Sequence, residues 1–208
     1  MPTLNIDQFK ARLIGGGARQ NLFQVTCNLP PWVRSAYPVN DLASFMIKGA
    51  SMPASTLGTI EIPFRGRKLK VAGDRTFEEW TITVINDLSF PVRNAFEYWS
   101  NGINSNKGNI GRNLLSEYES DWFINQLDKG GNITKSYVLR GAYPTNVAAI
   151  DVSYENEGIQ EFQVTMAYQY WESNTTPVQG TGSGPAFGIS VSAKVGPFTV
   201  AADAVTSI

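Results

Sequence analysis

The chain has 208 residues, enough for one domain with a sizeable core, and 42% of them are hydrophobic while only 17% are charged. Its 17 basic and 18 acidic side chains give a net charge of −1, which argues against a protein that binds nucleic acid through a basic excess. The sequence has no histidine and one cysteine, Cys27, so histidine-based catalysis, histidine metal ligands and an internal disulfide are excluded.

The N-terminal stretch MPTLNIDQFKARLIGGG lacks the long apolar segment of a secretory signal. No run in the chain approaches the roughly 20 apolar residues of a membrane span. We therefore expect a protein that is made in the cytoplasm without a membrane anchor, and we treat residues 1–19 as an N-terminal arm.

The segment NLFQVTCNL (21–29) alternates in the manner of a half-buried strand. Phe23, Val25, Cys27 and Leu29 share one side of it. Cys27 is therefore predicted to be a small, buried core residue.

The stretch TIEIPFRGRKLKV (59–71) predicts a hairpin with a turn at Gly66. Its apolar side chains alternate with polar ones, and we expect them to point inward: Ile60, Ile62, Phe64, Leu69 and Val71. Lys68 and Lys70 are expected to point outward.

The next stretch, KVAGDRTFEEWTITVIND (70–87), predicts a sharp turn at residues 72–74 followed by a strand. Gly73 permits a reversal, Asp74 can accept backbone hydrogen bonds, and Arg75 can offer a planar fork to a carboxylate. We predict that this loop makes an assembly contact through Lys70, Gly73, Asp74 and Arg75. In the strand, Trp80, Ile82 and Val84 should face the core.

One amphipathic helix is predicted, with Ser89 as its N-cap and Pro91 in its first turn. Its core-facing apolar residues are Val92, Phe96, Trp99 and Ile103, and Asn101-Gly102 should end the helix. Residues 104–131 fit either a short helix or an ordered loop.

Three further strands are predicted in the C-terminal half: residues 133–141, closed by Gly141, residues 146–154, and residues 158–172. In the second, Ile150, Val152 and Tyr154 should point inward. A turn at 155–158 should pair it with the third strand. That third strand should present one continuous apolar face: Phe162, Val164, Met166, Tyr168 and Tyr170.

About seven strands around one helix predict a mainly β fold with one α-helix, arranged as an antiparallel β-sandwich or barrel over residues 1–172. From Pro177 the chain becomes a Gly/Ser/Pro linker followed by weak alternation, so residues 173–208 are predicted to be an appendage.

No catalytic constellation emerges, and we expect neither an enzyme nor a cofactor or metal site. The glycines at 15–17 and at 180–184 lack the strand, helix and Lys-Ser/Thr context of a phosphate loop. Glu117, Glu119 and Asp121 form a small acidic patch that fits a solvated loop better than a cation site.

Four blocks of the sequence resemble the tail tube proteins of contractile-tailed bacteriophages. VAGDRTFEEWTITVIND (71–87) is similar to the central motif of that family, and RQNLFQV (19–25) to its opening strand. YPTNV (143–147) resembles its strand-entry turn and IQEFQVTMAYQYWE (159–172) its closing strand. The blocks occur in the order of the family and together span residues 19–172.

The resemblance implies a structural subunit with a β-sandwich-like fold, similar to that of type VI secretion tube proteins. It also implies homohexameric rings that stack into a hollow tube of the virion. The implied partners are the tail sheath protein, baseplate tube-initiator proteins, the tape-measure protein and genomic DNA in transit. Residues 173–208 have no counterpart in the family.

Duplex DNA must slide through such a tube, and each lumenal Lys or Arg would retard it. We therefore predict that a polar and acidic strand surface lines the lumen: Glu79, Thr81, Thr83, Glu161, Gln163, Thr165 and Gln169.

The sequence is also compatible with other functions. The long, proline-rich segment 27–57 suggests a baseplate-proximal tube initiator, and a tube of a phage-derived, protein-injecting particle is a second possibility. A monomeric β-sandwich binding module is the alternative from another class.

Overall fold

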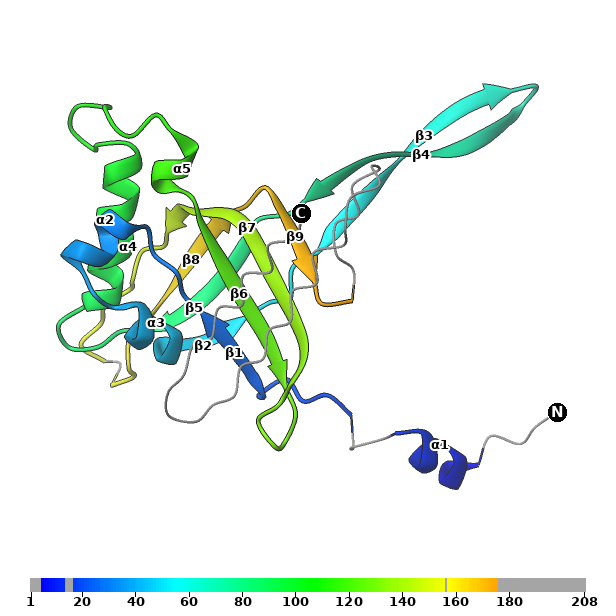
Figure 1. Ribbon diagram of the computed structural model, residues 1–208, viewed down its shortest axis with the longest axis horizontal. Helices are drawn as coiled ribbons and strands as arrows, with labels where there is room; N and C mark the ends of the chain where they lie inside the picture. The colour runs from blue at the N-terminus through cyan, green and yellow to red at the C-terminus, as the bar shows by residue number, and fades with distance from the viewer. Residues whose placement is uncertain (1–4, 14–16, 156, 176–208) are drawn as a thin grey trace, which may run out of the picture. The chain divides into compact units, whose positions relative to one another are not determined.

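The structure, a computed structural model, describes residues 5–13, 17–155 and 157–175 (Figure 1). The helices in this part of the chain are α1 (Ile6–Arg12), α2 (Pro31–Ala36), α3 (Asn40–Met46), α4 (Pro91–Ile103) and α5 (Leu115–Tyr118). Its strands are β1 (Phe23–Thr26), β2 (Ile47–Ala50), β3 (Ser55–Phe64), β4 (Arg67–Phe77), β5 (Trp80–Ile85), β6 (Ser120–Leu127), β7 (Ile133–Val147), β8 (Glu161–Ala167) and β9 (Tyr170–Ser173).

Seven strands form one antiparallel sheet in the order β1-β6-β7-β8-β5-β2, and β9 adds a further pairing to β7. Strands β3 and β4 form a separate two-stranded sheet (Figure 1). The predicted mainly β, antiparallel fold is therefore confirmed. The prediction of one helix is wrong, because four short helices accompany α4 in the described residues.

Strand β7 holds the two halves of the large sheet together. Its first part pairs with β6 and with β9, and its last part, from Tyr143 to Val147, pairs with β8. Between these parts Gly141 adopts a left-handed conformation with φ 64°, where an L side chain would be strained. Gly141 thus redirects the strand instead of ending it, which corrects the prediction of a strand closed at this residue.

The core is built around aromatic side chains of the sheet and α4. Trp122 of β6 lies 5.9 Å from Trp80 of β5 and 6.5 Å from Trp99 of α4, measured between ring centroids. Phe96 stacks on Trp99 at 6.2 Å. The predicted burial of the inward residues of β5 and of the apolar side chains of α4 is confirmed, except that Ile103 is half-buried.

The ends of α4 differ from their prediction. The residue that precedes the helix is Phe90, in a left-handed conformation with φ 53°, and not Ser89. Asn101-Gly102 lies inside the last turn. Gly102 is required there by packing, since a Cβ atom on it would lie 2.2 Å from the ring of Trp32.

Cys27 lies in the core as predicted, with 3% of its surface exposed. Burial raises the pKa of its thiol to about 12, although the Ser44 hydroxyl opposes this shift. The segment around it, 27–57, forms α2, α3 and β2 and packs on the same core through Val33, Ala43 and Ile47.

Two strand predictions in the C-terminal half are wrong. Residues 148–155 form no strand, and Val152 and Tyr154 are exposed. The single strand predicted over 158–172 divides into β8 and β9. After Ala167 the chain leaves β5 and moves to the first part of β7, where the backbone N–H of Gln169 donates to the carbonyl of Arg140. The alternation of Phe162, Val164 and Met166 is confirmed, whereas Tyr170 is exposed.

The ambiguous segment 104–131 contains α5 and β6. The predicted appendage 173–208 lies outside the described residues beyond position 175, as do the glycines at 180–184 and two of those at 15–17. Among the described residues, no helix has the length and apolar character that a membrane crossing requires.

Candidate assembly surfaces

Strands β3 and β4 form a hairpin whose turn is Arg65-Gly66, as the sequence predicts. Both turn residues have positive φ angles, 45° and 80°, which is the requirement of a two-residue type I′ turn. Arg65 lies over the ring of Phe64, with its guanidinium carbon 5.5 Å from the ring centroid. The tip of the hairpin thus combines an aromatic ring with a cation.

One face of the hairpin is apolar and uncovered. Ile60 pairs with Val71 and Ile62 with Leu69, which places these side chains on the same face with Phe64. Phe64 is 67% exposed and Leu69 is 61% exposed. The expectation that these residues point into the core is therefore wrong. We call this face the apolar stripe: Ile60, Ile62, Phe64, Leu69 and Val71.

The opposite face of the hairpin is charged. Glu61 lies across from Lys70 and accepts a hydrogen bond from Lys68 Nζ at 2.6 Å. Residues 55–77 contain five basic and two acidic side chains, an excess of three positive charges in a chain whose net charge is −1. The positive charge of the protein is therefore concentrated on this ribbon.

The predicted turn at residues 72–74 does not exist, because Gly73 lies within β4. Gly73 instead faces Gly58 at a β-bulge between Leu57 and Thr59. Arg75 Nη1 donates to the Ser55 hydroxyl at 2.9 Å and not to a carboxylate. The four residues of the predicted loop thus follow one strand of the hairpin, and their part in assembly stays a prediction.

A second surface lies on the side of β5 and β8 that faces away from the core. Thr81 pairs with Thr165 and Thr83 with Gln163, and the two threonine hydroxyls of the first pair lie 3.4 Å apart. Glu161 occupies the end of β8 on the same side. We call this surface the polar face: Thr81, Thr83, Glu161, Gln163 and Thr165. Glu79 and Gln169 lie outside the strands, and Gln169 donates to Glu119 at 2.9 Å.

Lys48 of β2 adds a cation beside the polar face that the sequence analysis missed. Its Nζ lies 2.6 Å from Glu161 Oε1. The alternation of the four-residue strand IKGA is too short to be recognised within the irregular segment 27–57. The Glu161 carboxylate balances the charge of Lys48 at this surface.

Arg140 of β7 ties three strands together. Its guanidinium donates to Asp121 of β6 at 2.6 Å and to Glu172 of β9 at 3.1 Å. The hydrogen bond to Asp121 raises the pKa of Arg140 above its usual range, the Glu172 contacts act in the same direction, and burial opposes them. Asp121 also accepts the backbone N–H of Gly141 at 3.0 Å. This cluster stabilises the fold where β7 changes direction.

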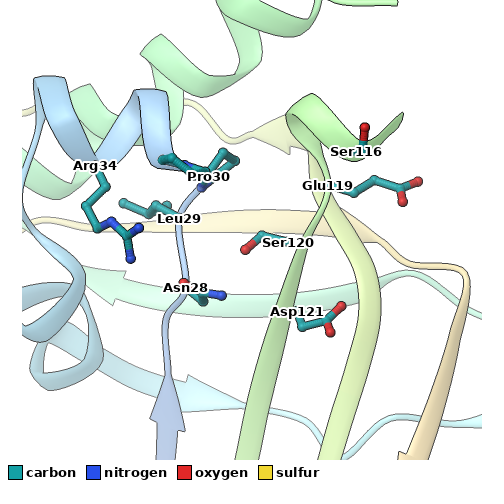
Figure 2. A pocket seen from close by; sticks show the side chains of 9 residues that line it. Asn28, Leu29, Pro30, Arg34, Ser116, Glu119, Ser120 and Asp121 are labelled. Atoms are coloured by element: carbon teal, nitrogen blue, oxygen red, sulfur yellow. The ribbon is translucent and has the colours of Figure 1, made fainter. Parts of the chain in front are cut away.

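A hollow of about 500 Å³ lies between the start of α2 and the start of β6 (Figure 2). Figure 2 shows Arg34 on one side of it and Glu119 and Asp121 on the other. Both carboxylates already accept hydrogen bonds, from Gln169 and from Arg140. The described part of the chain contains no group of three or more ligating side chains that could hold a metal ion. The acidic patch predicted here therefore belongs to the structural network.

Comparison with known sequences gives consistent matches. A family model described as phage tail tube protein matches residues 18–174. The tail tube protein gp19 of Enterobacteria phage T4 is 35% identical over 161 residues, which cover 76% of this chain and 93% of the relative. The tail tube protein of Serratia phage KSP90 is 32% identical over 149 residues, covering 71% and 84%.

Solved structures share the fold at low sequence identity. A chain from the cap that terminates the anti-feeding prophage tube aligns with a TM-score of 0.57 and 19% identity, over 76% of this chain and 90% of that chain. A chain from an extended sheath-tube complex of an extracellular contractile injection system aligns with a TM-score of 0.54 and 15% identity, over 81% and 97%.

Proposed function

Because the chain belongs to the phage tail tube protein family, we propose that its copies form hexameric rings that stack into the inner tube of a contractile tail. Membership of this family makes the protein a structural component of the virion. Its task is to form a conduit, and it needs no catalytic group for that task. We also propose that the chain is synthesised in the host cytoplasm before the tail is assembled.

The observation that carries the proposal is the apolar stripe of the hairpin. Five large apolar side chains share one exposed face of a two-stranded ribbon, and soluble monomers rarely expose a continuous apolar surface without using it for an interaction. An isolated two-stranded ribbon is also marginally stable. Docking against a neighbouring copy would bury the stripe and support the ribbon at the same time.

The polar face is our proposal for the surface of the lumen. Short hydroxyl and amide side chains offer the passing phosphate backbone no fixed positive charge. Lys48 would be repeated by the symmetry of a ring, yet its ion pair with Glu161 offsets its charge. Glu79 and Gln169 flank this surface at one end, because β5 begins where the antiparallel β8 ends.

We assign the chain to the main tube and not to a baseplate initiator. The segment 27–57, which suggested a specialised component, is occupied by α2, α3 and β2 of the body and adds no separate unit among the described residues. Along the tube, the tail sheath would surround the outer wall, initiator proteins would bind the first ring, and tape-measure protein and genomic DNA would occupy the lumen in turn.

Negative-stain electron microscopy of the purified full chain, over a concentration series and with a baseplate-complex seed, tests the proposal. Rings and hollow tubes with six-fold end views are expected. A monomer at every concentration, seeded and unseeded, would contradict it.

The lumen assignment needs a separate measurement. Glu161→Gln removes the partner of Lys48, so short duplex DNA should be retained more strongly inside tubes of this variant at low salt. The matched control, Glu97→Gln on α4, breaks the Arg93–Glu97 pair away from the polar face and should not change retention. Equal retention of DNA in both variants would contradict the assignment of the polar face to the lumen.

A further inference from the structure

A second exposed surface has the composition that complements the hairpin. Residues 148–155 and 157–160, which we call the acidic loop, connect β7 to β8 and form no helix or strand. Val152 is 78% exposed and Ile159 is 75% exposed, and Tyr154 is exposed as well. The acidic loop thus presents three large apolar side chains to solvent.

The charges of the acidic loop have one sign. Asp151, Glu155 and Glu157 are its charged side chains, and it contains no lysine or arginine. None of the three carboxylates forms an ion pair with any residue that the structure describes. Its three negative charges match in number the excess of three positive charges on the hairpin.

A hollow of about 470 Å³ lies between the acidic loop and the first residues of β8, and Asp151, Val152 and Ile159 are among its lining residues. Apolar and acidic groups of the loop therefore line the same recess, and Thr83, Glu161 and Gln163 at the edge of the polar face complete its lining. The hairpin tip presents the reverse combination, a Phe64 ring with the Arg65 guanidinium over it.

We propose that the hairpin of one copy docks on the acidic loop of a neighbouring copy, with the apolar stripe against Val152, Tyr154 and Ile159. Arg67, the cross-strand partner of Phe64, and Arg65, which lies over the Phe64 ring, then face the carboxylates of Asp151 and Glu155. This inference rests on the proposed function and assigns the partner surface of the hairpin. Because hairpin and acidic loop are different surfaces, the contact is heterologous and repeats from copy to copy.

Charge complementarity also explains why the contact is selective. Two hairpins, or two acidic loops, repel each other when they meet, whereas a hairpin and a loop attract. Burial of the apolar stripe supplies the affinity, since area removed from water is the main favourable term in association. The charges select the orientation in which that area is buried.

A charge-swap experiment on the full chain tests this contact. The hairpin variant carries Arg65→Glu and Arg67→Glu, the loop variant carries Asp151→Lys and Glu155→Lys, and a third variant carries all four changes. A control with Lys107→Glu and Lys129→Glu, at exposed turn positions, gives the same change of net charge as the hairpin variant. Thermal unfolding of each variant establishes that its body is folded.

The critical concentration for tube formation, measured by sedimentation, should rise at least tenfold in the hairpin variant and in the loop variant. It should return to within threefold of the wild type when both sets of changes are present, and the control should match the wild type. Loss of assembly in the hairpin variant alone, with a normal loop variant, would overturn the inference and leave the tube function intact. A wild-type chain that forms neither rings nor tubes would overturn both.

Discussion

Gly58 and Gly73 lie opposite each other in the hairpin so closely that a Cβ atom on Gly73 would stand 3.2 Å from the carbonyl carbon of Gly58. A Cβ atom on Gly58 would in turn lie 3.1 Å from the carbonyl oxygen of Asp74. The two glycines therefore allow the backbones of β3 and β4 to approach at the bulge. This contact sets the twist with which the hairpin presents its apolar stripe.

Gly73→Val should loosen the hairpin and leave the body of the protein intact. The backbone of Gly58, 3.2 Å from the added Cβ atom, must shift to admit it, so amide hydrogens of β3 and β4 should exchange faster with solvent. The free energy of unfolding should change by less than about 0.5 kcal/mol, as for a substitution outside the core. Hydrogen exchange followed by mass spectrometry measures the first effect, and Ala72→Val, at the neighbouring exposed position, is the control. Slower or unchanged exchange in the Gly73 variant would contradict this account of the bulge.

Trp122 and Trp99 provide a matched pair for a test of the core. The indole N–H of Trp99 donates to the Tyr118 carbonyl at 2.8 Å, whereas the buried indole N–H of Trp122 has no hydrogen-bond partner among the described residues. Both tryptophans are fully buried, so substitution by phenylalanine removes the same volume. Trp99→Phe should lower the free energy of unfolding by about 1–2 kcal/mol more than Trp122→Phe, because only the first leaves a carbonyl without its donor. Urea denaturation of both variants measures the difference, and equal losses would argue against it.

Arg140→Gln should destabilise the fold by about 1–2 kcal/mol, since it leaves the Asp121 and Glu172 carboxylates without their shared cation. Arg140→Lys should recover less than half of the loss, because one ammonium group lacks the planar fork that reaches both carboxylates. Lys48→Gln, which breaks an exposed pair, is the control and should cost less than about 0.5 kcal/mol. Full recovery by lysine would show that only the charge matters at this position.

The buried thiol of Cys27 predicts a pH dependence at the alkaline end. Its pKa is about 12 in the folded protein, compared with 9.0 for a free thiol. The unfolded chain therefore loses this proton first, and the stabilising contribution is complete below about pH 9 and declines as the pH rises toward 12. Over that interval Cys27 contributes a slope of up to about −1.4 kcal/mol per pH unit. The slope for Cys27→Ala, measured by urea denaturation between pH 9 and 10.5, should be smaller; the same slope in both proteins would disprove the assignment.

The core strands could be predicted from the sequence because their alternation reports a surface that the same chain covers. Trp80, Ile82 and Val84 alternate with threonines, and every one of them is buried. Ile60, Ile62 and Phe64 alternate just as regularly, yet they remain exposed. Alternation identifies an apolar face and says nothing about whether another part of the chain or another molecule covers it.

The remaining errors arose where tertiary contacts outweigh local signals. Gly141 reads as the end of a strand, but β7 continues through it because β8 pairs with the following residues. Gly73 reads as a turn residue, but its role is to let two strands approach. Asn101-Gly102 reads as a helix end, but Trp32 occupies the space that the missing side chain leaves. Each glycine was recognised, while its purpose depends on a partner that is distant in the sequence.

The pairing of β1 with β6 has a consequence for the order of folding. Val25 lies opposite Ile124, so β1 cannot enter the sheet before most of the chain has been synthesised. The hairpin, whose strands are neighbours in the sequence, can form much earlier on the ribosome. A nascent chain then carries an exposed hairpin before its own acidic loop has been made, so two chains at this point of synthesis cannot dock on each other.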